Sequence, residues 1–205
     1  MLSIYEQYKH IFQNSRKFGK TTDDMKQHFL ERTNYHISLV QKYLDKIIAL
    51  NDSRLDNKIL EQEKIHDQSK FKEPEYSPYL HINWKYYLKD QGKEYNPPDE
   101  IKNQMHAASF HHIVSNKHHP DYWDKNITPD NLNSEDRDKP AKIVDSTRMP
   151  PTYVASMIAD WLAMSEEKKT DPYEWAQKNI NKRWKFTDEQ VKLIYDLLNR
   201  IWKNN

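Results

Sequence analysis

Apolar side chains recur at the spacing of a helix, three or four residues apart, over most of the chain. Between residues 24 and 50 one stripe consists of Phe29, His36, Val40, Tyr43 and Ile47, at spacings of seven, four, three and four residues. Such a stripe predicts an amphipathic helix with one buried face. Histidine is the unusual member of this stripe, and we expect His36 to project toward the core.

The same spacing predicts further helices, which are separated by breaks at proline. Asp23 or Asp24 can cap the helix that begins at about residue 24. Further along, Pro74 and Pro78 interrupt the chain. No segment shows the two-residue alternation of a half-buried strand, and no internal repeat occurs. We therefore expect an all-α protein with helices at residues 2–18, 24–50, 56–66, 78–89, 99–115, 152–165, 172–180 and 187–202, and with a long loop at residues 120–140.

Glycine and cysteine are the residue types that most restrict the chemistry. The 205 residues include two glycines, Gly19 and Gly92, and no cysteine. Phosphate-binding loops and dinucleotide-binding folds need several glycines, because the backbone must approach the phosphates closely, so neither is expected. Scarce glycine also argues against an all-β fold. The lack of cysteine excludes disulfides, cysteine-bound zinc, iron–sulfur clusters and a cysteine nucleophile.

The charges are almost balanced, with 32 Lys and Arg against 31 Asp and Glu. Because no basic block is present, we expect no nucleic-acid partner, and we interpret the basic–aromatic segment Asn181–Phe186 as a solvated helix end. No apolar run approaches the ~18–20 residues of a membrane span. The first residues lack the apolar stretch of a secretion signal. We expect one domain over residues 1–205, located in the cytoplasm, or in the host cytoplasm if the protein is viral.

The histidines are distributed unevenly. Half of the ten histidines fall within fourteen residues, namely His106, His111, His112, His118 and His119. Histidine is the commonest protein metal ligand and titrates near neutral pH. This segment is therefore a candidate site.

The sharpest short motif is His66-Asp67-Gln68-Ser69-Lys70. An adjacent histidine and aspartate at a helix end can direct an imidazole and a carboxylate at the same cation. Lys70 could pair with Asp67 or with an anionic substrate. Further along, Asp160 lies in an apolar helical stripe beside Met157 and Trp161. A carboxylate that faces a core needs a cation or strong hydrogen-bond donors.

Taken in order, these residues read H…HD…H…H…D on a helical chain, which resembles the HD superfamily of metal-dependent phosphohydrolases. The resemblance runs from His36 to Asp160. The segments HDQSKF, HHIVSNKHHPDYW and MIADWLAMS also resemble an uncharacterised HD-like family of phages and bacteria. The resemblance implies a single-domain HD-like helical bundle, with a metal-site core at about residues 24–166 and C-terminal helices at about residues 171–203.

The resemblance also implies a ligand set. The primary metal ligands would be His36, His66, Asp67 and Asp160, and a second metal would be held by His112 with His118 or His119. Helix geometry favours His112 over His111, because Ile101, Met105, Ala108 and His112 form one stripe and His111 lies about 100° around the helix. We take His119 as the ligand and His118 as the acid, although the reverse assignment stays open.

The ligand types suggest a mechanism. Imidazole and carboxylate suit one or two divalent ions of Mn, Fe, Co, Ni or Zn, with Mg also possible. Asp67 would bridge the ions, a metal-activated water would attack phosphorus, and Lys70 would neutralise phosphate charge. His118 would protonate the leaving oxygen. Glu75, Tyr76 and Tyr79 follow the motif closely and could line the pocket. Arg148 or Lys117 could help Lys70 to neutralise phosphate charge.

Three functions fit this set. The first is a phosphohydrolase that acts on a small phosphorylated substrate, with a nucleotide favoured. The second is a di-iron oxygenase on the same helical scaffold. The third is a metal-stabilised binding protein without turnover, which we rank last because the ligand set looks complete.

Overall fold

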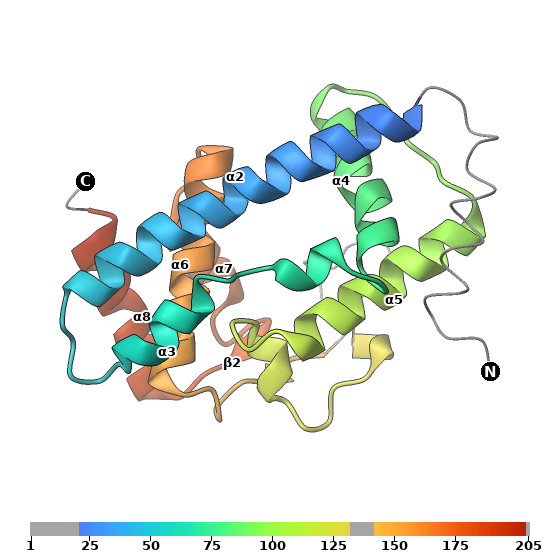
Figure 1. Ribbon diagram of the computed structural model, residues 1–205. Helices are drawn as coiled ribbons and strands as arrows, with labels where there is room; N and C mark the ends of the chain where they lie inside the picture. The colour runs from blue at the N-terminus through green and yellow to red at the C-terminus, as the bar shows by residue number, and fades with distance from the viewer. Residues whose placement is uncertain (1–20, 132–141, 204–205) are drawn as a thin grey trace. The chain divides into compact units, whose positions relative to one another are not determined.

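The computed structural model describes residues 21–131 and 142–203. These residues are mostly helical, which confirms the all-α prediction (Figure 1). The helix expected at residues 2–18 lies outside the described residues. The elements are α2 (Thr21–Ala49), α3 (Asn57–Glu63), η2 (Gln68–Phe71), α4 (Tyr76–Asp90), α5 (Asp99–Ser115), η3 (Pro120–Trp123), η4 (Pro129–Asn131), β1 (Val144–Asp145), α6 (Pro151–Lys168), α7 (Pro172–Asn179), β2 (Trp184–Lys185) and α8 (Asp188–Ile201).

The chain divides into two compact units, and each is described by itself. Within the described residues, unit 1 contains residues 21–34 and 67–112, and unit 2 contains residues 35–66, 113–131 and 142–203. Helix α2 contributes its first half to unit 1 and its second half to unit 2. The expectation of a single domain over residues 1–205 stays a prediction.

Unit 1 is built on a small aromatic core. Met25 and Phe29 from α2 pack with Tyr79 and Leu80 from α4 and with Ala108 from α5, and all five side chains are buried. The ring of Tyr76 meets the ring of Phe29 edge-on, with 5.5 Å between centroids. This core fixes α4 against the first half of α2, and both ends of the unit 1 segment 67–112 carry candidate site residues.

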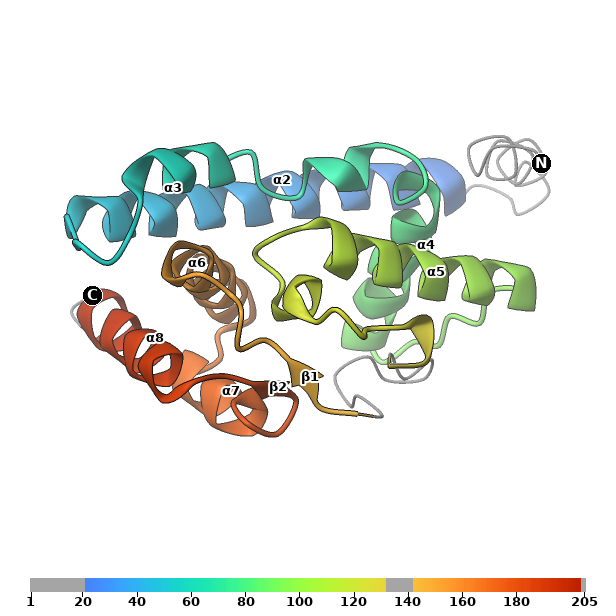
Figure 2. The same cartoon turned by 90° about the horizontal axis from the view of Figure 1, so that it is seen from below.

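Unit 2 has the larger core, in which α6 packs against α8 (Figure 2). Ile158 and Leu162 of α6 are completely buried, as are Ile194 and Leu197 of α8. The stripe that the sequence predicts on α2 is buried, as expected. Each of its members is at most 2% exposed, namely Phe29, His36, Val40, Tyr43 and Ile47. Burial of such side chains stabilises a fold by roughly 1.5–3 kcal/mol each.

Two sequence interpretations need correction. Two-residue strands are present, since β1 pairs in parallel with β2 through Val144 opposite Trp184. The segment Asn181–Phe186 is therefore not a solvated helix end: it contains β2, and Trp184 and Phe186 are each 4% exposed. Their rings belong to the unit 2 core, and the indole N–H of Trp184 donates to the buried Asp121 carboxylate at 3.0 Å. The apolar content of the segment outweighed its charges.

Local rules account for the remaining boundaries. Asp56 caps α3 by accepting hydrogen bonds from the backbone N–H groups of Lys58 and Ile59. This helix ends at Glu63, earlier than expected, so His66 lies in a turn. The expected loop at residues 120–140 contains the short helices η3 and η4 in its described part. No described helix combines the length and the apolar content that crossing a membrane would require.

Candidate metal centre

Three residues from distant parts of the sequence meet in unit 2. His36 projects from α2, His66 lies in the turn after α3, and Asp160 projects from α6. The Oδ1 atom of Asp160 lies 3.0 Å from Nε2 of His36 and 3.6 Å from Nε2 of His66. One potential ligand nitrogen of His36 lies within 4.8 Å of one of His66. His36 and His66 both belong to a buried group that could hold a metal ion, and Asp160 contacts both of them.

The protonation of Asp160 depends on the two histidines. Burial alone would raise the pKa of this carboxyl, because it disfavours the charged form. The close contact with His36 and the electrostatic effect of both His36 and His66 outweigh that effect and hold the pKa of Asp160 well below its usual range. The site therefore presents an anionic oxygen between two imidazoles, which is the charge that a divalent cation requires.

A second carboxylate stands on the other side of His36. The Oε2 atom of Glu167 lies 3.5 Å from Nδ1 of His36, while Nε2 of the same ring faces Asp160. Asp160 and Glu167 are seven residues apart on α6, so they lie on one face of that helix. Sequence reasoning missed Glu167, although this spacing from Asp160 was a usable signal.

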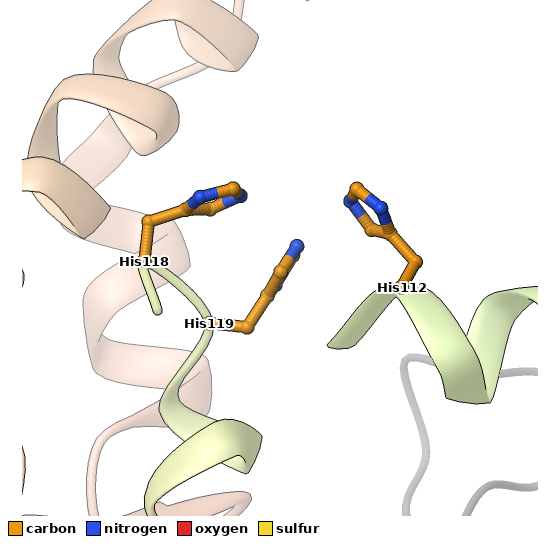
Figure 3. A group of neighbouring side chains, drawn as sticks. All are labelled: His112, His118 and His119. Atoms are coloured by element: carbon orange, nitrogen blue, oxygen red, sulfur yellow. The ribbon is translucent and has the colours of Figure 1, made fainter. Parts of the chain in front are cut away.

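His118 and His119 lie in the turn between α5 and η3. Their rings project to the same side of the chain, with centroids 4.3 Å apart (Figure 3). His118 is 4% exposed, and its ring centroid lies 4.0 Å from that of His66. Neighbouring residues can direct their side chains the same way here because the turn releases them from helical geometry. Both histidines belong to a group that could hold a metal ion.

In unit 1, Asp67 lies next to His112. The Oδ1 atom of Asp67 is 3.2 Å from Nε2 of His112, and the ammonium group of Lys70 donates to Oδ2 of Asp67. Of the two roles considered for Lys70, the structure thus shows the pairing with Asp67. Asp67 has a left-handed backbone (φ 58°), as the residue before η2. Both Asp67 and His112 are 2% exposed.

Glu75 is the centre of a hydrogen-bonded group in unit 1. Its carboxylate is completely buried and lies 2.8 Å from Nδ1 of His112 and 2.8 Å from Nδ1 of His111. The hydroxyl of Ser69 donates to Oε2 of Glu75 at 2.9 Å. Burial would raise the pKa of Glu75, but the hydrogen bonds and charge of His112, followed by those of His111 and Ser69, lower it. Glu75 was expected only as a pocket residue.

The two neighbouring histidines of α5 differ in exposure. The side chain of His112 is 2% exposed and that of His111 is 43% exposed, in line with the helical stripe. His111 nevertheless contacts Glu75, which the stripe did not predict. Because Glu75 has two oxygens, it reaches both rings at once. His112 faces Asp67, and His111 lies at the solvent side of Glu75.

The remaining candidates are placed as follows. Tyr79 packs edge-on against His112, at 5.5 Å between centroids, and Lys70 lies 5.2 Å from the centre of the Tyr79 ring. Arg148 is exposed and donates to the carbonyl of Trp123. Lys117 is exposed, with its ammonium 5.5 Å from the centre of the Tyr153 ring. Neither of these contacts of Arg148 and Lys117 points to phosphate binding.

A family model matches residues 25–200, and its description is "Family of unknown function (DUF5662)". The chain belongs to DUF5662. The match includes every histidine and carboxylate described above. A comparison with curated proteins and another with solved structures each found no match. The family's description names no function, so the chemistry of the site is what bears on the function of this DUF5662 chain.

The donor atoms of this DUF5662 chain fit a transition metal. Two imidazoles and one carboxylate meet in unit 2, and one imidazole and one carboxylate meet in unit 1. Such nitrogen and oxygen sets suit Mn, Fe, Co, Ni or Zn better than Mg, which prefers oxygen alone. Each of His36 and His112 also has a carboxylate at its other ring nitrogen, as metal-bound histidines usually do.

Proposed function

We propose that the protein is a divalent-metal-dependent phosphohydrolase that acts on a small phosphate ester, with nucleotides favoured. The observation that carries the proposal is the meeting of His36, His66 and Asp160, three residues that the HD-like order of the sequence singled out. Support for phosphate chemistry comes from the resemblance to HD phosphohydrolases, and support for metal binding comes from the donor set.

In the ligand assignment that we propose from the HD resemblance, His36, His66, Asp67 and Asp160 would hold one ion. Asp67 is included because it follows His66 directly in the chain. His112 and His119 would hold a second ion, with Asp67 as the shared ligand. The contact between Asp67 and Nε2 of His112 supports the proposal that these two residues bind the same ion.

The metal would supply Lewis acidity and a bound water of lowered pKa. The other roles fall to side chains. Lys70 keeps a positive charge beside Asp67 and would counter the charge of a phosphate oxygen. His118, a buried imidazole packed against His66, would give a proton to the leaving oxygen. Tyr79 packs against both His112 and Lys70 and so would hold them in place.

The test is phosphate release by metal-reconstituted protein. Wild type is stripped with a chelator, reloaded with Mn²⁺, Co²⁺, Zn²⁺ or Mg²⁺, and assayed with nucleoside mono-, di- and triphosphates. We expect release that requires metal and falls by orders of magnitude in Asp67→Asn. The matched control is Asp90→Asn, an exposed aspartate at the end of α4, which should behave as wild type. Equal activity in Asp67→Asn and wild type would contradict the proposal.

A di-iron oxygenase is the second candidate, and one observation favours it. The set His36, His66 and Asp160 consists of two histidines and one carboxylate, which is the ligand type of oxygenases with a single non-haem iron and so favours iron at this site. A second iron would need the ligands proposed for the second ion. Iron in protein purified from iron-supplied cells, together with oxygen consumption and no phosphate release, would support this candidate. Metal binding without any turnover would support the non-catalytic alternative.

A further inference from the structure

His112 is held between two buried carboxylates. Its Nε2 atom lies 3.2 Å from Asp67, and its Nδ1 atom lies 2.8 Å from Oε2 of Glu75. His36 has the same arrangement in unit 2, with Asp160 at Nε2 and Glu167 at Nδ1, although the second distance is 3.5 Å. The two rings therefore share one orientation rule: Nε2 faces a proposed ligand carboxylate and Nδ1 faces another one.

This orientation matters because an imidazole binds a metal through a nitrogen that carries no proton. A carboxylate that accepts the proton of the opposite nitrogen fixes which nitrogen stays available and makes it a better donor. At 2.8 Å the contact of Glu75 with His112 has the length of a charge-assisted hydrogen bond. The Glu167 contact with His36 is longer than the usual range, so its influence should be smaller.

Glu75 is itself held firmly. Its backbone N–H donates to the carbonyl of Lys72, and its carbonyl accepts from the N–H of Tyr79 in the first turn of α4. Its carboxylate oxygens receive Ser69 and the two imidazoles of α5. A completely buried carboxylate would be costly without such partners. The surrounding residues thus fix Glu75, and Glu75 in turn fixes His112.

We propose that Glu75 is a positioning residue that keeps the proton of His112 on Nδ1 and so directs Nε2 toward a metal ion. Glu167 faces Nδ1 of His36 at 3.5 Å, beyond the usual hydrogen-bond length, so we limit the inference to Glu75, and Glu167 serves as the comparison. The metal-binding part of this inference rests on the proposed function. The position of the proton does not, because it can be measured in the protein without metal.

The first experiment is ¹H–¹⁵N NMR of the histidine side chains in full-length protein, metal-free and Zn²⁺-loaded. We expect a slowly exchanging, downfield Nδ1 proton on His112, assigned by its loss in His112→Gln. In Glu75→Gln this signal should move upfield or exchange too fast to be seen. Absence of a protected Nδ1 proton on His112 in wild type would overturn the inference, whether or not the protein binds metal.

The second experiment compares metal affinities by competition with a chelating dye. Glu75→Gln should bind Zn²⁺ and Co²⁺ ~10–100-fold more weakly than wild type, and Glu167→Gln should show a smaller loss. Glu94→Gln, an exposed glutamate beyond α4, is the matched control and should bind as wild type. Ser69→Ala, which removes one donor to Glu75, gives a milder variant if Glu75→Gln does not fold; it should weaken binding several-fold.

The outcomes separate the two proposals. If wild type binds no metal, the proposed function fails and the NMR result alone decides the role of Glu75. If wild type and the Glu75 and Ser69 variants bind metal equally well, the positioning role is overturned and the proposed function stands. A change in the Co²⁺ absorption spectrum that shows one oxygen ligand lost in Glu75→Gln would make Glu75 a ligand, which also overturns the positioning role.

Discussion

The Oδ1 atom of Asp160 lies 3.0 Å from Nε2 of His36, although α6 and the second half of α2 are far apart in the sequence. The same oxygen lies 3.6 Å from Nε2 of His66. One carboxylate oxygen thus lies at hydrogen-bond distance from His36 and beyond that distance from His66. The proposed role of this oxygen as a metal ligand leads to the first prediction.

Divalent metal should stabilise wild type, and the effect should depend on Asp160. An ion that binds only the folded state adds about 2.7 kcal/mol when its concentration is a hundred times its dissociation constant. We expect Mn²⁺, Co²⁺ or Zn²⁺ to raise the melting temperature of wild type, a chelator to reverse the rise, and Asp160→Asn to show almost none. Calorimetry with Asp90→Asn as control checks this. A full metal-induced rise in Asp160→Asn would contradict the proposed ligand role of Asp160.

Asp52 should contribute stability at neutral pH that is lost in acid. Hydrogen bonds from Arg54 and Arg200, at 2.6–2.9 Å, hold the pKa of this largely buried carboxyl well below its ordinary value of 3.8. Because the folded-state pKa is the lower one, this contribution is present above pH 3.8 and falls as the pH drops below that value. Asp52→Asn should lower the free energy of unfolding by about 1–3 kcal/mol at pH 7.

Urea denaturation of wild type and Asp52→Asn at neutral and acidic pH tests this dependence. The difference between them should shrink as Asp52 is protonated. An equal difference at pH 7 and at pH 3 would show that the charge of Asp52 is not its cause.

His81 should stay neutral in mildly acidic solution. Burial lowers its pKa from 6.5 to about 4, and its Nδ1 atom lies 2.7 Å from the hydroxyl of Tyr95. Below pH 6.5 the unfolded chain takes up the proton first, so this residue reduces stability as the pH falls toward 4. An NMR titration of the His81 ring should give a midpoint near 4, and Tyr95→Phe should leave it below 6.5. A midpoint of 6.5 in wild type would be incompatible with the burial.

The start of α8 should be sensitive to loss of its cap. Thr187 accepts the N–H of Gln190, and the Gln190 side chain accepts the N–H of Thr187, which is a capping box. Thr187→Ala should lower the free energy of unfolding by about 1 kcal/mol, and Thr187→Ser should retain most of it. Gln190→Ala should lower it further, because Gln190 also donates to the carbonyls of Ser146 and Met149. Chemical denaturation of the three variants checks this order.

The helices could be predicted from sequence because their signals are local. Spacing placed His36 on a buried face, and the prolines at 97–98 and 120 bounded α5 at residues 99 and 115, as observed. The strands β1 and β2 could not be predicted, since two-residue strands have no periodicity. Asn181–Phe186 was misinterpreted because Lys182, Arg183 and Lys185 suggested solvent, whereas Trp184 and Phe186 decided the burial.

The site divides in the same way. Asp160 was identifiable, because a carboxylate in an apolar stripe is unusual. Glu167 was missed, because a glutamate in the charged end of α6, next to Glu166, looks like a solvated residue. The two glutamates have different fates: Glu166 accepts from Lys42 and Tyr43, while Glu167 faces His36. The sequence of a single segment does not show which residue of another helix will contact each of its side chains.

The left-handed backbone at Asp67 restricts which residues this position can accept, apart from any role in binding. At φ 58° most side chains cost about 1–2 kcal/mol, whereas glycine, asparagine and aspartate adopt this region more readily. A library randomised at position 67 and selected for folding alone should therefore return mainly Gly, Asn and Asp. Selection of the same library for metal binding should leave Asp, because it alone combines the backbone tolerance with an anionic oxygen. The difference between those two survivor lists would measure how much of the position belongs to the chain and how much to its chemistry.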